Sequence, residues 1–70
     1  MSVYKITFFL GKNHSKLEHI LGKPFDEFGK LGHLRNEGIS VNYPKYTLYI
    51  SLPEDVAEQI RNDGFKVEKI

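Results

Sequence analysis

The sequence predicts an α+β fold in which two helices cover one face of a four-stranded antiparallel sheet. Three observations carry this prediction. Apolar and polar residues alternate over 2–10, helix start and stop signals frame 15–22 and 53–64, and a second alternating run spans 39–52 with a proline near its middle. With a last strand at 65–70, the element order is β-α-(irregular)-β-β-α-β.

The first strand, "SVYKITFFL", has one apolar face. This face consists of Tyr4, Ile6, Phe8 and Leu10. A glycine ends the strand, and "SKLEHILG" then has the features of a short helix. Ser15 stands three residues before Glu18, as in a capping box, and Gly22 followed by Pro24 provides the stop.

The segment over 23–37 is expected to be irregular. Its apolar residues are three apart, which suits helical turns, and they are Phe25, Phe28, Leu31 and Leu34. Gly29 and Gly32 interrupt this series, and each costs about 1 kcal/mol relative to Ala in a helix interior. We therefore expect one or two irregular turns whose aromatic side chains fill the core.

The run "ISVNYPKYTLYISL" predicts a hairpin with Pro44 and Lys45 in its turn. Ile39 and Val41 are expected to face inward from the first arm. The inward residues of the second arm are Leu48, Ile50 and Leu52.

"PEDVAEQIRNDG" is then a helix. Its first turn is acidic and it ends at Gly64. Its buried stripe consists of Val56, Ala57 and Ile60. The final "FKVEKI" is a strand whose charges protect an exposed edge.

Two βαβ crossovers around a hairpin give a ferredoxin-like βαββαβ arrangement with the first and third strands in the centre. The irregular segment lies in the first crossover. In the alternative arrangement this segment breaks the crossover and leaves a less regular α+β domain. Seventy residues make one domain, 1–70, with little room for a deep pocket.

Composition excludes several chemistries. The chain has no cysteine, so disulfides, thiolate metal sites and cysteine nucleophiles are absent. No apolar run approaches the roughly 20 residues of a membrane span. The apolar N-terminus alternates with Lys5 and Thr7, as a strand does and a signal segment does not. We expect a soluble, cytoplasmic protein without a cofactor.

The charge is weakly asymmetric along the chain. Residues 1–45 carry seven Lys or Arg against four Asp or Glu, and residues 46–70 carry three against five. A dedicated nucleic-acid binder usually has a stronger basic excess.

The quartet "GKLG" resembles the GxxG loop of KH-type RNA-binding domains, and a hairpin and a helix follow it in the KH order. The resemblance would imply a phosphate-gripping loop between two helices. Only six residues separate Gly32 from Ile39, which is too short for the second KH helix. We interpret the stretch as a mildly basic surface loop that offers Lys30, His33 and Arg35 as candidate phosphate contacts.

Two further patterns in the chain contain residue types that can carry chemistry. In "GKNHS", Lys12 and His14 precede a helix start that could hold an anion, but ordinary capping by Ser15 explains the stretch as well. The three histidines fit no zinc spacing, and the acidic pairs at 26–27 and 54–55 diverge on a helix. We therefore expect no catalytic and no metal site.

Elimination favours a small binding module, an accessory or inhibitor protein of the kind common among phage and mobile-element products. Its partner would be a larger protein or nucleoprotein complex. The candidate surface is the open sheet face, with Lys30, His33 and Arg35 at its rim. The candidate residues on the face itself are Lys5, Thr7, Phe9 and Tyr49.

Two alternatives remain open. The same residues could bind single-stranded nucleic acid, because aromatic residues on central strands can stack on bases. An edge strand, either 65–70 or 39–43, could instead pair with its twin and make a homodimer.

Overall fold

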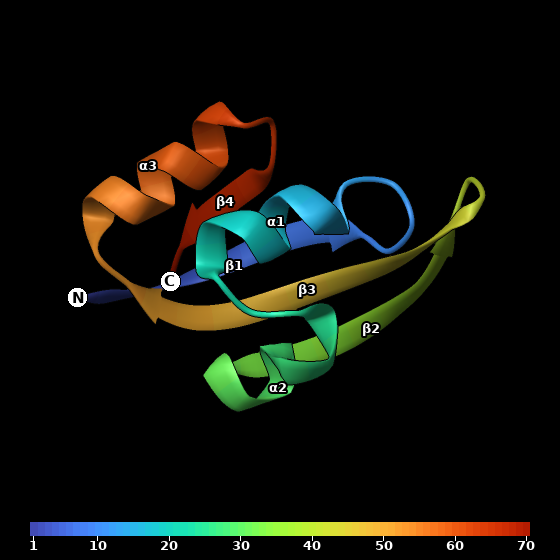
Figure 1. The fold of residues 1–70 in the computed structure, drawn as a ribbon, viewed down its shortest axis with the longest axis horizontal. Helices are drawn as coiled ribbons and strands as arrows, with labels where there is room; N and C mark the ends of the chain where they lie inside the picture. Colours follow the sequence, from blue (N-terminus) through green and yellow to red (C-terminus); the bar gives the residue numbers. More distant parts are fainter.

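The computed structural model describes all 70 residues and shows a four-stranded antiparallel sheet with three helices, an α+β fold (Figure 1). The strands are β1 (Ser2–Phe9), β2 (His33–Ser40), β3 (Tyr43–Leu52) and β4 (Lys66–Lys69). The helices are α1 (His14–Leu21), α2 (Phe28–Leu31) and α3 (Glu54–Asn62), and a 3₁₀ turn, Phe25–Glu27, precedes α2. The strand order is β2-β3-β1-β4, which confirms that the first and third strands are central.

The core lies on one face of the sheet. The central strands supply Tyr4, Ile6, Phe8, Leu48, Ile50 and Leu52, and the helices supply Leu17, Phe28, Ala57 and Ile60. Phe65 and Val67 complete this single cluster. The inward faces predicted for the first strand, the second hairpin arm and the last helix are thereby confirmed. The alternation also assigns Leu10 to this face, but β1 ends at Phe9 and Leu10 follows it in a turn.

The irregular segment fills the core as predicted. Phe28 is fully buried, and Phe25, Leu31 and Leu34 pack against the cluster. The ring of Phe8 meets those of Phe28 and Phe25 edge to face, with centroids 5.6 and 6.0 Å apart. Such pairs add to the stabilisation from apolar burial alone. The segment also forms a third helix, the single turn α2, which the sequence did not predict.

The start of α1 differs from the prediction. The helix begins at His14 with Asn13 at the N-cap, so Ser15 lies inside it and the capping box is wrong. The Glu18 carboxylate has another partner, because its Oε2 accepts a hydrogen bond from the Phe25 N–H at 2.7 Å. This bond fixes the chain where it leaves α1, and the stop at Gly22 is confirmed by its left-handed φ of 72°.

The hairpin turn also lies elsewhere. Ser40 pairs with Tyr43, so the turn consists of Val41 and Asn42. Pro44 and Lys45, the predicted turn residues, belong to β3.

The first arm of the hairpin begins at His33, six residues before the predicted start at Ile39. A β-bulge between Asn36 and Ile39, with Gly38 at a φ of 94°, shifts the alternation. Ile39 and Val41 are 79% and 86% exposed at the tip of the hairpin, so the prediction that they face inward is wrong.

The three helices are short. They span eight, four and nine residues. None of them has the length and the apolar character that crossing a bilayer requires.

Candidate binding surface

The second face of the sheet, which we call the open face, points away from the core cluster. Alternation and strand register place 15 side chains on it. From β1 and β3 these are Val3, Lys5, Thr7, Phe9, Tyr43, Lys45, Thr47, Tyr49 and Ser51; from β2 and β4 they are His33, Arg35, Glu37, Ser40, Lys66 and Glu68. The buried side chains of all three helices belong to the core on the other face, so no helix covers the open face.

Strand pairing arranges these side chains in rows. One row consists of His33, Tyr49, Lys5 and Glu68, and the next consists of Arg35, Thr47, Thr7 and Lys66. A third row pairs Phe9 with Lys45. Residues directly opposite one another in an antiparallel sheet have Cβ atoms about 5 Å apart, so each row is a continuous strip of contact.

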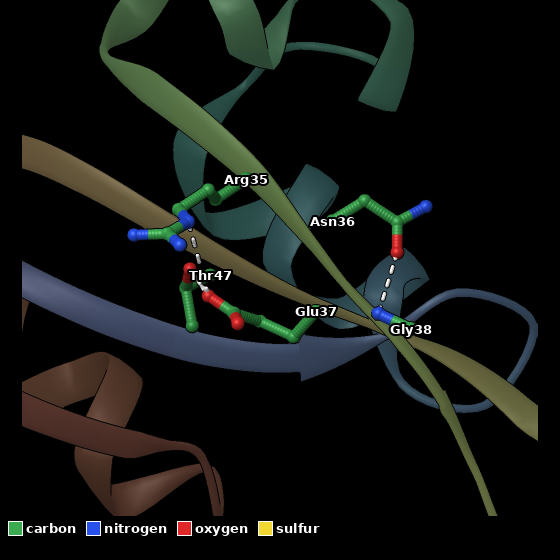
Figure 2. Close-up of polar contacts among 5 residues, drawn as sticks. All are labelled: Arg35, Asn36, Glu37, Gly38 and Thr47. Carbon is green, nitrogen blue, oxygen red and sulfur yellow. Dashed lines mark hydrogen bonds and ion pairs between the residues drawn. The ribbon is translucent and has the colours of Figure 1, made fainter.

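The β2 bulge directs a carboxylate over the centre of the open face. The Gly38 N–H donates to Asn36 Oδ1 at 2.7 Å, which holds the bulge (Figure 2). Glu37 then accepts a hydrogen bond from the Thr47 hydroxyl at 3.0 Å and lies 3.7 Å from the Arg35 Nε. As a result Thr47 is only 2% exposed although it lies on the open face.

The two predicted aromatic anchors each have a neighbour on the open face. The Lys12 ammonium lies over the Phe9 ring, 5.4 Å from its centroid. The Tyr49 ring lies 6.0 Å from the imidazole of His33, at an angle of 43°. Phe9 and Tyr49 are both half-buried, so each keeps exposed surface.

The structure brings together six of the seven predicted site residues. Lys5, Thr7, Phe9 and Tyr49 lie on the two central strands, where they were predicted. His33 and Arg35 belong to strand β2 instead of a loop, so they extend the rows of the open face where a rim of loop residues was expected.

Lys30 is separated from this group. It lies on α2, which packs on the core side of the sheet. "GKLG" is therefore the turn α2 and its junction with β2, and Gly32 is where the chain passes close to β3. A Cβ at Gly32 would stand 2.1 Å from the Tyr49 carbonyl oxygen. This close approach explains why residue 32 is a glycine, and no phosphate contact is needed to explain it.

Sequence reasoning missed a repeated pattern. Residues 5–9 read "KITFF" and residues 45–49 read "KYTLY", so both central strands carry lysine, threonine and an aromatic residue at alternate positions. Lys45 was missed because it was predicted to lie in a turn, although its alternation with Thr47 and Tyr49 indicates a strand. In the antiparallel register, Lys5 pairs with Tyr49, Thr7 with Thr47, and Phe9 with Lys45. The pattern is thus related to itself by a local two-fold axis through the threonine pair.

Positive charge is concentrated on the open face. The open face, with Lys12 beside it, has five cations against two carboxylates, a balance of +3. These residues are Lys5, Lys12, Arg35, Lys45 and Lys66, with Glu37 and Glu68. The rest of the chain carries five Lys or Arg against seven Asp or Glu, a balance of −2.

Other parts of the molecule are weaker candidates for a functional site. No three His, Cys, Asp or Glu side chains gather as a metal site would require. Two shallow depressions border α1 at Ser15 and His19, and only one of them has an apolar lining residue, Ile20. At the end of β1 and in the loop that follows, the N–H groups of Phe9 and Gly11 already donate to the Asn13 and His14 side chains, so they do not point at an anion.

Comparisons with protein-family models, with curated proteins and with solved structures gave no match for this chain.

Proposed function

We propose that this protein is a non-enzymatic binding module that docks on a larger protein, or on the protein part of a nucleoprotein complex, through its open face. The observation that carries the proposal is the uncovered face itself, where two half-buried aromatic rings lie among unpaired cations. We also propose that the fold is the ferredoxin-like arrangement, since the strand order and the two crossovers are those expected for it.

The mechanism would be steric. An uncovered sheet face can occupy a partner's working surface without any chemistry of its own, as an accessory or inhibitor protein does. Aromatic residues supply most of the energy in such interfaces, and truncation of a central anchor commonly costs about 2 kcal/mol or more of binding free energy. Tyr49, on a central strand, and Phe9, beside Lys45, are the candidate anchors.

The test is capture of partners from a native lysate with the tagged protein and with variants, in nuclease-treated and untreated halves. Tyr49→Thr and Phe9→Thr remove the rings but keep residues that favour strands. His19→Ala, at an exposed position on α1, is the matched control. We expect one partner protein to be captured in both the nuclease-treated and the untreated half. The control variant should also capture it, and either ring variant should lose it. Retention by both ring variants, with circular dichroism showing them folded, would contradict the proposal.

A second candidate function is binding of single-stranded nucleic acid, which the +3 balance of the open face favours. Two contacts work against it. A base that stacks on Phe9 must displace the Lys12 ammonium, and the Glu37 carboxylate is held over the centre of the face. Recovery that disappears with nuclease would move this function to first place.

A further inference from the structure

The lysines of the two central strands form no ion pair within the chain, although Glu68 of β4 is directly across from Lys5. Arg35 and Lys66 each lie 3.7 Å from a carboxylate, of Glu37 and Glu68 respectively. Lys5 and Lys45 form no ion pair, although both are half-buried by their neighbours on the open face. Two lysine side chains therefore remain without an ion-pair partner on this face.

Each unpaired lysine has an aromatic ring directly across from it in the neighbouring strand. Lys5 is opposite Tyr49, and Lys45 is opposite Phe9. The two lysine–aromatic pairs are related by the local two-fold axis through Thr7 and Thr47. They are four residues apart along the strands, which corresponds to about 13 Å at the usual rise of ~3.3 Å per residue.

We infer that the open face binds an acidic, extended segment of a partner protein whose two carboxylates are about 13 Å apart, one at each lysine–aromatic pair. This inference rests on the proposed function and names the chemistry of the partner. In an extended chain, side chains four positions apart lie on the same face with this spacing, so one strand-like segment can reach both pairs. Each carboxylate meets an ammonium, and apolar atoms beside it pack on the ring.

Charge complementarity also selects among other occupants. A second copy of the chain would bring one +3 face against another, so self-association through this face is disfavoured. Nucleic acid would meet the same lysines, but it would also meet the carboxylates of Glu37 and Glu68 in the outer strands. An acidic protein segment also passes the Glu37 carboxylate, which accepts the Thr47 hydrogen bond between the two pairs, but it can place a neutral residue there, whereas a nucleic acid carries a phosphate at every step.

The experiment is a nuclear magnetic resonance titration of the ¹⁵N-labelled full chain with defined probes. The first probe is a short peptide of serine and threonine with two glutamates four positions apart. The second has the same composition with the glutamates adjacent, the third has glutamines in their place, and the fourth is an oligodeoxythymidylate. We expect the first peptide to shift amides of β1 and β3 and to bind more tightly than the other three probes.

Variants assign the effect to the two lysines. Lys5→Gln and Lys45→Gln should each weaken binding of the first peptide about threefold, in line with partly exposed ion pairs. The double variant Lys16→Gln/Lys23→Gln changes two exposed lysines outside the open face and should leave the affinity unchanged. The same spectra show whether each variant is folded.

Three results would overturn the inference. These are equal affinity for the two glutamate peptides, amide shifts confined to the helical side, and tighter binding of the oligonucleotide. The two proposals can fail independently. A captured protein whose retention depends on Tyr49 and Phe9 but not on Lys5 and Lys45 would support the binding face and reject only the acidic segment.

Discussion

The two glycines of "GKLG" allow a sharp test of why this stretch has its composition. Gly32→Ala would place a Cβ 2.1 Å from the Tyr49 carbonyl oxygen and 3.1 Å from the Ile50 Cα. Both contacts are with backbone in the central strand β3, so no flexible side chain can move aside. The φ of Gly32 is −171°, which any residue adopts, so the cost arises from the close approach alone.

The size of the effect follows from this geometry. Non-bonded carbon and oxygen atoms need roughly 3 Å, so β2 and β3 must separate locally by about 1 Å. Forcing extra atoms into a packed site typically costs 1–3 kcal/mol. A loss of 2 kcal/mol lowers the Tm of a domain of this size by about 8–16 °C. The same shift would displace Tyr49, so the variant should also weaken any binding through the open face.

Gly29→Ala is the matched control. Nothing lies within 4 Å of a Cβ at Gly29, and Ala favours helix over Gly by up to about 1 kcal/mol. Urea denaturation followed by circular dichroism should therefore show Gly32→Ala destabilised and Gly29→Ala unchanged or slightly stabilised. Equal stability of the two variants, or a larger loss at Gly29, would refute the explanation.

Four further substitutions test the packing and the ends of elements, all by urea denaturation. Phe28→Ala should lower the free energy of unfolding by about 3–5 kcal/mol, because the ring is fully buried; a loss under 1 kcal/mol would show that it is not. Glu18→Ala should lower the free energy of unfolding by about 1.5 kcal/mol, because it removes the acceptor of the Phe25 N–H, whereas Ser15→Ala should change it by less than about 0.5 kcal/mol. A larger loss for Ser15→Ala than for Glu18→Ala would instead support the capping box. Val41→Asn should raise stability by about 1 kcal/mol, since φ there is 63°, and no gain would argue against that strain.

Much of the fold could be predicted because it depends on local patterns. Alternation in β1 and β3 identifies the buried residues of both central strands, and antiparallel pairing follows from the crossovers. The apolar spacing of Phe25 and Phe28 identifies the aromatic side chains that fill the core, despite Gly29 and Gly32 in the same segment.

The hairpin was predicted, but the position of its turn could not be, because the strongest local turn signal is misleading. Pro44 is a typical turn residue, but here it lies in β3 and its carbonyl accepts a hydrogen bond from the Leu10 N–H at 2.9 Å. The actual turn contains Val41, a β-branched residue in a left-handed conformation that propensity disfavours. Tertiary pairing of β2 with β3 overrides both preferences.

The candidate surface was predictable only in part, for the same reason. Phe9 and Tyr49 follow from strand alternation alone. His33 and Arg35 join them only because β2 begins at His33 and the bulge before Ile39 shifts its alternation by one residue. Lys45 joins them only because the hairpin turn lies before it, at Val41 and Asn42. Side chains brought together by register cannot be found until the register is known.

The composition of the open face argues for a binding role over simple solvation. A 70-residue chain has helices enough for one side of its sheet, so the other side has to tolerate water. Lysine and threonine meet that requirement, and threonine also favours strands. Aromatic rings do not serve solubility, yet one stands opposite the unpaired lysine in each half of the local two-fold pattern, at Phe9 and at Tyr49. A face that only contacts water needs neither the aromatic rings nor their placement opposite lysines. A face with two equivalent binding subsites for a partner needs both.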